Sequence, residues 1–170
     1  DFVVVVLPPN KTLDRSDVIT CTGGNSRSVS VYNGLMAAKS LSPDKVLIHD
    51  VARPAVSEDI ITDIILTINE ETGAAPGLPI SDAIWEVSDG EIKKTLDRNF
   101  IFRAQTPQGF PYSKILKAHD AQSSHSAFDD VELAKKFGLK VILKTGHKDN
   151  MKITTPEDFI KMSKILVKKV

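Results

Sequence analysis

The fold is decided by one stretch of the sequence, Lys45-Val46-Leu47-Ile48-His49-Asp50-Val51-Ala52-Arg53-Pro54. Residues 45–48 form a short apolar run that predicts a β-strand, and Pro54 ends any regular pairing after it. Ligands bind at the carboxyl ends of strands in a parallel α/β sheet. Asp50 would supply there the hard oxygen ligand that Mg²⁺ prefers, and the planar guanidinium of Arg53 would bind a phosphate. The alternative is a plain surface ion pair at a strand end.

Composition indicates one globular domain of ordinary size. The chain has 170 residues with 22 acidic and 22 basic side chains, so charge gives no case for nucleic acid or an anionic membrane as a partner. No apolar run is long enough to span a bilayer, and no signal peptide opens the sequence. The single cysteine, Cys21, fits a reducing compartment. We therefore expect a cytoplasmic protein with one domain over residues 1–170.

The first residues suggest that the native chain is longer. The sequence opens at Asp1 rather than methionine and runs directly into Phe2-Val3-Val4-Val5-Val6-Leu7. A continuous β-branched run is typical of a buried parallel strand and not of a first, edge strand. We therefore expect more chain upstream, which makes the domain incomplete at its N-terminus.

Strands and helices alternate along most of the chain. Short apolar runs predict strands at 2–7, 18–21, 45–48, 74–80 and 140–144. Apolar residues at helical spacing predict helices over 26–39, 57–73, 112–121, 129–138 and 155–170. This alternation predicts an α/β fold with a doubly wound, mostly parallel, Rossmann-like sheet.

Residues 83–96 follow a different pattern. Two short runs, 83–87 and 91–96, flank Ser88-Asp89-Gly90, which predicts a β-hairpin with Asp-Gly at its bend. A two-stranded hairpin has too little core to stand alone, so we expect a protruding β-arm at about 82–98 that packs on another surface, for which a partner subunit is one candidate. Arg98, at the foot of this arm, is either an ordinary solvated charge or an anion ligand across a dimer contact.

Basic side chains stand at the ends of several predicted elements. They are Arg27, Arg53, Arg98 and Lys152, and they accompany the strand-end acid Asp50. The sequence has no histidine or cysteine cluster with metal spacing, no serine elbow and no Walker or dinucleotide-binding glycine loop. Cations with one metal-binding acid suit phosphoryl or nucleotidyl transfer, where catalysis is mostly alignment and charge neutralisation. Anion binding without chemistry would suit them equally.

Two further features lie at helix starts. The turn Thr22-Gly23-Gly24-Asn25-Ser26-Arg27 joins a strand to a helix, where free backbone N–H groups can receive a nucleobase or a phosphate. The alternative is a tight connection with no ligand. Asp129 and Asp130 begin another helix, as the helix dipole favours, so we predict a structural role for this pair in preference to metal binding.

A set of short motifs follows one another along nearly the whole chain. In order they are Gly23-Gly24-x-x-Arg27-x-x-Ser30-Val31, His49-Asp50-x-Ala52-Arg53-Pro54, Asp97-Arg98, Thr106-Pro107-Gln108, Asp129-Asp130 and Asp149-Asn150-x-Lys152-Ile153-Thr154-x-Pro156-Glu157-Asp158. This ordered set resembles the methylerythritol phosphate cytidylyltransferase family of the non-mevalonate isoprenoid pathway. The amino-acid sequences of residues 73–76, 102–110 and 129–132 are particularly similar to those of the family members that are fused to the cyclodiphosphate synthase in some bacteria.

The resemblance implies a reaction in which the phosphate of methylerythritol phosphate attacks the α-phosphorus of CTP, with Mg²⁺ as cofactor, and pyrophosphate leaves. It assigns nucleotide binding to Gly24, Asn25, Arg27, Ser30, Asp50 and Ala52. It assigns substrate binding to Arg53, Ala83, Arg98, Thr106 and Lys152. It assigns catalysis to Arg98 and Lys152, and Mg²⁺ binding to Asp50. It also implies a homodimer joined through the hairpin arm.

Several positions depart from the family pattern. The family's glycine-rich loop, with its arginine and lysine, precedes the first strand and is absent from this sequence, and the stretch between Pro9 and Gly23 is shorter than usual. Asn25 replaces a commoner acid, while Ala83 and Phe128 replace hydroxyl residues. Two alternatives therefore stay open. One is a related pentitol-phosphate cytidylyltransferase, distinguished by the residues around Ala83 and Phe128, and the other is a non-catalytic nucleotide-binding or dimerisation module.

Overall fold

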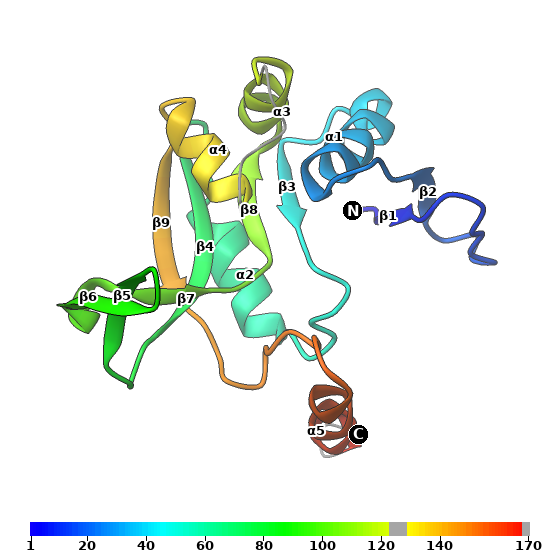
Figure 1. Cartoon of the computed structure of the whole chain (residues 1–170). Helices are drawn as coiled ribbons and strands as arrows, with labels where there is room; N and C mark the ends of the chain where they lie inside the picture. The colour runs from blue at the N-terminus through cyan, green and yellow to red at the C-terminus, as the bar shows by residue number, and fades with distance from the viewer. Residues whose placement is uncertain (123–128, 168–170) are drawn as a thin grey trace. The chain divides into compact units, whose positions relative to one another are not determined.

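The computed structural model describes residues 1–122 and 129–167 of the chain (Figure 1). The chain divides into two compact units. Unit 1 comprises Asp1–Ile48, Thr67–Ala74 and Gln108–Ile142. Unit 2 comprises His49–Leu66, Ala75–Pro107 and Leu143–Val170. The expectation of one nucleotidyltransferase domain over residues 1–170 stays a prediction.

Unit 1 begins with two short parallel strands, β1 (Val4–Leu7) and β2 (Ile19–Thr22). It continues with α1 (Arg27–Ala37), η1 (Lys39–Leu41) and β3 (Lys45–Ile48). Its later segments hold β8 (Gln108–Pro111), α3 (Tyr112–Asp120) and α4 (Asp130–Lys136). The strand predicted at 45–48 is therefore confirmed, and the predicted helices at 26–39, 112–121 and 129–138 are present with shorter bounds.

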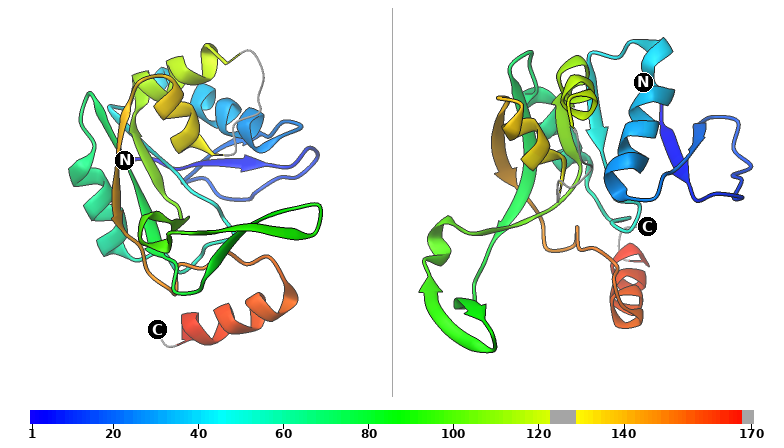
Figure 2. Two further views of the ribbon diagram at one scale, coloured as in Figure 1. Left: turned by 60° about the vertical axis from the view of Figure 1, so that its left-hand side comes forward. Right: turned by 45° about the horizontal axis from the view of Figure 1, so that its top comes forward.

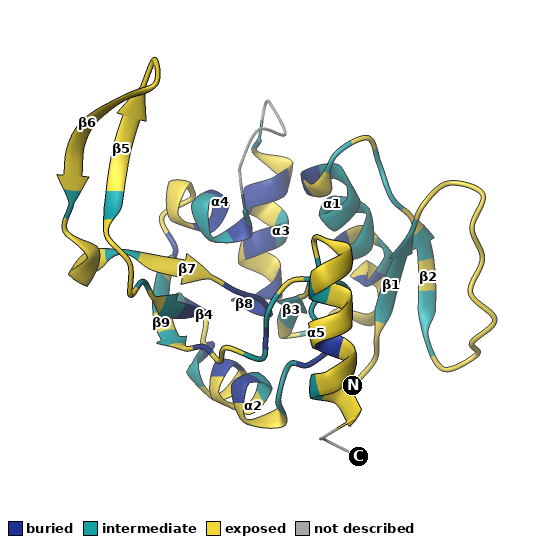
Figure 3. Cartoon of the chain, turned by 60° about the horizontal axis from the view of Figure 1, so that its bottom comes forward, coloured by how far each residue is buried: buried dark blue, intermediate teal, exposed yellow. Residues whose placement is uncertain are grey.

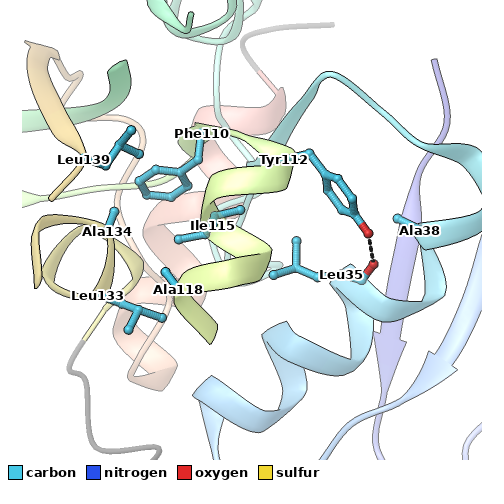
Figure 4. Close-up of a cluster of buried hydrophobic side chains, with 9 residues drawn as sticks. All are labelled: Leu35, Ala38, Phe110, Tyr112, Ile115, Ala118, Leu133, Ala134 and Leu139. Atoms are coloured by element: carbon cyan, nitrogen blue, oxygen red, sulfur yellow. Dashed lines mark hydrogen bonds between the residues drawn. The ribbon is translucent and has the colours of Figure 1, made fainter. Parts of the chain in front are cut away.

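The core of unit 1 is a cluster of buried apolar side chains from α1, β8, α3 and α4 (Figure 4). Its members are Leu35, Ala38, Phe110, Tyr112, Ile115, Ala118, Leu133, Ala134 and Leu139. The Tyr112 hydroxyl donates a hydrogen bond to the carbonyl oxygen of Leu35 (2.8 Å), so its polar group is satisfied inside the cluster. Burial of each large apolar side chain contributes about 1.5–3 kcal/mol. This cluster therefore fixes the helices that carry several candidate site residues.

Unit 2 contains most of α2 (Glu58–Thr67), η2 (Arg98–Phe100), β7 (Phe102–Ala104) and α5 (Pro156–Val167) (Figures 1 and 2). Helix α2 buries Ile60 and Ile64, as its apolar stripe predicts, but ends six residues before the predicted Gly73 because β4 (Thr72–Pro79) already begins in that region. Helix α5 begins at Pro156 as predicted. The Thr155 hydroxyl accepts the backbone N–H of Asp158 (3.2 Å), and the Asp158 carboxylate accepts the N–H of Thr155 (3.2 Å), which is a capping box.

The predicted hairpin is confirmed as the antiparallel pair β5 (Ile84–Ser88) and β6 (Glu91–Leu96), in unit 2. Asp89 and Gly90 both have positive φ values, 54° and 77°, as a tight type I′ bend requires. Nearly all of the hairpin is exposed, as Figure 3 shows. That it serves as an arm toward a partner subunit stays a prediction.

The central sheet corrects the prediction of a mostly parallel arrangement. Its strands follow the order β3-β8-β4-β7, and β9 (Lys140–Thr145) also pairs with β4. The pairs β3–β8, β4–β8 and β4–β7 are all antiparallel, and β1–β2 is a parallel pair in a sheet of its own. The α/β content and a mixed sheet are confirmed, whereas the prediction that the sheet is mostly parallel is wrong. The doubly wound, Rossmann-like arrangement stays a prediction.

The physical reason lies in residues 102–111, for which we predicted no strand. Residues 102–104 pair with residues 77–79, and Gly109 pairs with Ala74, so this segment follows β4 in the opposite direction. It is interrupted at 105–107, where Gln105 N–H still donates to the Pro76 carbonyl oxygen (2.9 Å). Between β4 and β7 the chain forms only β5, β6 and η2, without the α-helical crossover that usually joins parallel neighbours.

A helix that crosses a bilayer needs about 20 mostly apolar residues. Among residues 1–122 and 129–167, no helix has the length and apolar character needed to cross a membrane.

Candidate active site

In unit 2, the carboxylate of Asp50 faces two cations. Lys152 Nζ lies 3.1 Å from Asp50 Oδ2, and Arg53 Nε lies 3.5 Å from the same oxygen. The side chains of Asp50 and Arg53 are only 17% and 11% exposed, whereas that of Lys152 is 44% exposed. Charges that are partly withdrawn from water interact more strongly than surface pairs. Together with His49 and Thr106, these residues are named the Asp50 cluster below.

The Thr106 hydroxyl joins His49 to Asp50. The backbone N–H of Asp50 donates to Thr106 Oγ1 (3.0 Å), and the Thr106 hydroxyl lies 2.9 Å from His49 Nδ1. His49 Nε2 lies 3.1 Å from the Arg53 carbonyl oxygen, which can only accept, so Nε2 carries the proton and Nδ1 accepts from Thr106. Partial burial lowers the pKa of His49, although its hydrogen bond to the Arg53 carbonyl and the charge of Asp50 oppose this. A neutral His49 satisfies every donor in this chain of hydrogen bonds.

The guanidinium of Arg53 is fixed by backbone carbonyl groups. Its Nη1 donates to the Asn150 carbonyl oxygen (2.8 Å), and its Nη2 donates to that of Ala104 (3.4 Å). The carbonyl oxygen of Ala52 accepts the backbone N–H of Ile153 (2.8 Å). The loop after β3 is therefore bound to the segment that carries Lys152, which brings together residues far apart in the sequence.

Two buried amides, Gln105 and Asn150, complete this framework. Gln105 Nε2 donates to the carbonyl oxygens of His147 (2.9 Å) and Asn150 (3.1 Å), and Asn150 Nδ2 donates to that of Thr106 (2.8 Å). A Cβ on Gly146 would lie 2.4 Å from Gln105 Oε1, so glycine is what allows this loop to approach so closely. Sequence reasoning gave neither amide a role. The signal available was their position beside Thr106 and Lys152 in the quoted motifs.

In unit 1, the connection between β2 and α1, together with the first turn of α1 (residues 22–30), is named the glycine turn. The Ser26 side chain caps α1 by accepting the N–H of Val29 (3.2 Å). The Ser30 hydroxyl donates to the Ser26 carbonyl oxygen (2.9 Å) and accepts the N–H of Gly24 (3.1 Å). A Cβ on Gly24 would lie 2.1 Å from Val29 Cγ1, so this position needs glycine for close approach. The turn therefore connects β2 to α1 as predicted, and Asn25 is exposed on it.

Arg27, the first residue of α1, forms an ion pair within unit 1. Its Nη1 lies 2.7 Å from Asp130 Oδ2, and the Asp130 side chain is only 2% exposed. The neighbouring Asp129 caps α4 by accepting the N–H of Glu132 (2.8 Å). Asp129 thus has the structural, helix-capping role predicted for the acidic pair, while nucleotide binding by Arg27 stays a prediction.

Arg98 and Ala83 lie at the foot of the hairpin and do not belong to the Asp50 cluster. Both are exposed, and Arg98 Nη1 donates to the carbonyl oxygen of Ser81. Phe128, the other position at which the sequence departs from the family pattern, lies outside the described residues. The structure therefore brings Asp50, Ala52, Arg53, Thr106 and Lys152 together, while the predicted role of Arg98 stays a prediction.

Within residues 1–122 and 129–167, no three or more His, Cys, Asp or Glu side chains are grouped so that they could hold a metal ion.

Comparison with known proteins agrees with the motif order. The family model described as 2-C-methyl-D-erythritol 4-phosphate cytidylyltransferase (IspD) matches residues 1–168. The chain belongs to the IspD family. Members of this family are cytidylyltransferases, a class of nucleotidyltransferase enzymes.

Curated IspD relatives include single and fused forms. The bifunctional enzyme IspD/IspF of Ruegeria sp. strain TM1040 is 44% identical over 150 residues, which are 88% of this chain and 39% of that protein. The 2-C-methyl-D-erythritol 4-phosphate cytidylyltransferase of Roseobacter denitrificans is 42% identical over 170 residues, covering 98% of this chain and 76% of that protein. The chain thus spans well under half of the fused relative and about three quarters of the single one.

Solved IspD structures share the fold. The enzyme from Thermus thermophilus gives a TM-score of 0.84 at 30% identity, covering 97% of this chain and 82% of that one. The bifunctional IspDF of Campylobacter jejuni gives 0.74 at 26% identity, covering 88% of this chain and 38% of that one. The likeness to the Thermus enzyme therefore extends over nearly all of the chain.

Proposed function

We propose that this chain is the cytidylyltransferase domain of an enzyme that transfers CMP from CTP to 2-C-methyl-D-erythritol 4-phosphate in non-mevalonate isoprenoid biosynthesis. An oxygen of the sugar phosphate forms a bond to the α-phosphorus of CTP. The bond from that phosphorus to the bridging oxygen breaks, and pyrophosphate leaves with that oxygen and its electron pair. The membership of the IspD family supports this reaction.

The observation that carries the proposal is the ion-paired Asp50, held 3.1 Å from Lys152 and 3.5 Å from Arg53. Cations that already face one acid can redistribute toward phosphates once these arrive, which supplies the alignment that phosphoryl transfer needs. In this assignment Lys152 holds the attacking phosphate, Arg53 contacts phosphate, and Asp50 and Ala52 contact the ribose. The Thr106 hydroxyl, beside Asp50, contributes to substrate binding.

In this proposal the glycine turn binds the nucleobase of CTP. Gly24, Asn25 and Ser30 would contact the cytosine, with Arg27 as a further nucleotide ligand. The turn is held by its own hydrogen bonds before any ligand binds, because Ser30 already bonds to Gly24 and Ser26. A preorganised turn loses little entropy on binding, which favours affinity.

Asp50 is also the proposed Mg²⁺ ligand. Magnesium in proteins is held by one or two carboxylates together with substrate phosphates and water, so a single carboxylate that is still 17% exposed fits the ion. When bound, Mg²⁺ would neutralise charge on the phosphates of CTP. The chain's own contribution is to hold that carboxylate through the Asp50 N–H bond to Thr106.

The hairpin supports a homodimer. Trp85, Val87 and Ile92 are 56%, 55% and 53% exposed, and Val87 lies opposite Ile92 in the ladder. Three apolar side chains on so small a ribbon are expected to be covered by another surface. In the proposed dimer this surface is the partner subunit, and Arg98 holds the attacking phosphate there. We propose a cytoplasmic location, without nucleic acid or membrane partners, on the sequence arguments alone.

The test is pyrophosphate release from CTP by the full-length gene product, with and without methylerythritol phosphate. Release that requires the sugar phosphate supports the proposal. Release only with a pentitol phosphate would assign the chain to the related cytidylyltransferase, and release with neither acceptor would favour the non-catalytic module. The 170-residue chain, assayed in parallel, shows whether sequence beyond it is needed.

Arg98→Ala tests the role given to the hairpin. We expect the KM for methylerythritol phosphate to rise by about tenfold, because one charge-assisted contact to phosphate is lost, while CTP binding stays within about twofold. Arg103→Ala, which removes an exposed arginine of β7, is the matched control. A loss confined to CTP affinity would contradict the assignment.

A further inference from the structure

Asp130 is an unusual residue because it is an almost fully buried acid with no role in the proposed reaction. Its Oδ2 lies 2.7 Å from Arg27 Nη1, and its Oδ1 lies 3.2 Å from Nε2 of His119, whose side chain is fully buried. Burying a carboxylate is costly unless its partners are held in good geometry. Asp130 has such partners on both oxygens, His119 from the buried interior and Arg27 from the surface.

Arg27 is the only one of these three residues that reaches the surface, with 37% of its side chain exposed. It begins α1 and directly follows Ser26, which caps the helix and accepts the Ser30 hydroxyl. Ser30 in turn accepts the Gly24 N–H. Any displacement of Arg27 is therefore passed to the backbone of the glycine turn.

Asp130 itself is anchored from the core of unit 1. The Gln108 side chain, 2% exposed, donates through Nε2 to Asp129 Oδ2 (3.1 Å) and accepts the N–H of Val131 through Oε1 (3.3 Å). These bonds flank Asp130 on both sides in the sequence and attach the start of α4 to β8. The carboxylate is thus a fixed point against which Arg27 is oriented.

We propose that Asp130 is a positioning residue for the nucleotide: it holds Arg27, and through Arg27 the glycine turn, in the orientation that receives CTP. This inference rests on the proposed function and deepens it. The competing explanation is that the ion pair only joins α1 to α4. The two differ because a merely structural pair changes stability without a selective change in CTP affinity.

The decisive variant is Asp130→Asn in the full-length protein. The asparagine Oδ1 can still accept from His119, whereas its amide group presents N–H toward Arg27, so the substitution breaks the ion pair selectively. We expect the Kd for CTP, measured by titration calorimetry, to rise about tenfold, since small misplacements of binding groups are costly. The KM for methylerythritol phosphate stays within about twofold.

Tyr32→Phe is the matched control on the same helix. It removes the bond from the Tyr32 hydroxyl to Asp120 (3.0 Å) without touching Arg27. Its CTP affinity is expected to stay within about twofold of wild type. Equal loss of CTP affinity in both variants, or a lower melting temperature of Asp130→Asn with unchanged CTP affinity, overturns the proposal.

A double variant tests the path through Arg27. In an Arg27→Gln background, Asp130→Asn is expected to weaken CTP binding by less than about twofold further, because the residue it positions is gone. A further loss of about tenfold there overturns the proposal. If Asp130→Asn does not fold, Arg27→Lys serves instead, since it keeps the charge but not the planar fork, and unchanged CTP affinity overturns the inference.

Failure of the inference and of the proposed function are distinguishable. Wild-type protein that binds CTP but releases no pyrophosphate with methylerythritol phosphate contradicts the proposed function alone, and the effect of Asp130→Asn is still read by calorimetry. If wild-type protein releases pyrophosphate with methylerythritol phosphate and Asp130→Asn binds CTP as tightly as wild type, only the inference is contradicted. Wild-type protein that binds no CTP overturns both.

Discussion

The glycine turn of unit 1 and the Asp50 cluster of unit 2 are built in opposite ways. The hydrogen bonds within the turn join residues three, four and six positions apart in the sequence. Most of those made by side chains in the Asp50 cluster join residues 51 to 97 positions apart, whereas the bond between His49 and the Arg53 carbonyl, four positions apart, is local. The turn is thus specified by its own short sequence, whereas the cluster exists only when distant loops have been brought together.

This difference has a consequence for substitutions. A change in the glycine turn should act on the local backbone and on whatever binds there. A change in the Asp50 cluster should act on several loops at once, because Arg53, Thr106 and Lys152 each bond to a loop other than their own. Single substitutions can therefore distinguish a local effect from an effect on several loops.

Asp50→Asn is expected to have the largest effect on catalysis. It removes the charge that faces Lys152 and Arg53 and the proposed Mg²⁺ ligand, so we expect a fall in kcat of about 10²-fold or more. The backbone bond from Asp50 to Thr106 remains, so the fold should be kept. The measurement is Mg²⁺-dependent pyrophosphate release, with circular dichroism to check the fold.

The matched control for this variant is Asp63→Asn, since Asp63 pairs with Lys144 (2.8 Å) on a half-exposed carboxylate away from the cluster. Its turnover is expected to equal that of wild type. Unchanged turnover in Asp50→Asn would remove the metal assignment.

Gly24→Ala tests the locally built region. The new Cβ would lie 2.1 Å from Val29 Cγ1, so the turn or the first turn of α1 has to move. Overpacking of this kind typically costs about 1–3 kcal/mol, and we expect a matching fall in the free energy of unfolding in urea. CTP affinity should fall, while the KM for methylerythritol phosphate stays unchanged. Gly90→Ala is an unsuitable control because Gly90 has a positive φ of 77°.

A better control for the turn is Gly34→Ala, where the new Cβ would lie 2.9 Å from Val6 Cγ2, a much milder contact than the 2.1 Å at Gly24. A small stability change with unaltered CTP affinity is expected there. If both variants weaken CTP equally, the glycine turn has no special part in nucleotide binding.

Elements with local signals could be predicted from the sequence. The strand 45–48, the Asp-Gly bend of the hairpin and the Thr155 start of α5 all depend on residues within a few positions of one another. The sheet direction could not be predicted in the same way. Whether residues 102–111 follow β4 antiparallel depends on pairing between segments about 30 residues apart, which hydrophobic periodicity does not encode.

The same distinction between local signals and long-range contacts applies to the candidate site. The glycine turn and its cap could be read from Gly24, Ser26 and Ser30, and the pairing of Asp50 with Arg53 from their spacing. The buried supports Gln105 and Asn150 could not, because a polar residue in a loop gives no local sign of whether it is buried. The partner of Arg27 could not be predicted from the sequence either, since Asp130 lies about a hundred residues away.

Thr106→Val is expected to have the next smaller effect. It tests the Asp50 cluster, whose hydrogen bonds join residues far apart in the sequence. The valine has a similar shape but leaves the Asp50 N–H and His49 Nδ1 without the buried hydroxyl that now bonds to both. An unsatisfied buried polar group costs about 1–3 kcal/mol, so unfolding should need less urea. Thr106→Ser keeps the hydroxyl and is the control. Equal stability of the valine and serine variants would show that this hydrogen-bond chain contributes nothing.

The smallest expected effect is a pH dependence carried by His49. Burial lowers its pKa below the ordinary value of 6.5, so between the two values the unfolded chain binds more protons than the folded chain. Stability from this group is therefore complete above about pH 6.5 and is lost as the pH falls through that window. Because the side chain is partly exposed and Asp50 acts against the shift, the loss is small. His49→Gln, compared with wild type by thermal unfolding between about pH 5 and 7.5, should show a flatter profile; a profile parallel to that of wild type would mean that the proton on His49 is not linked to folding.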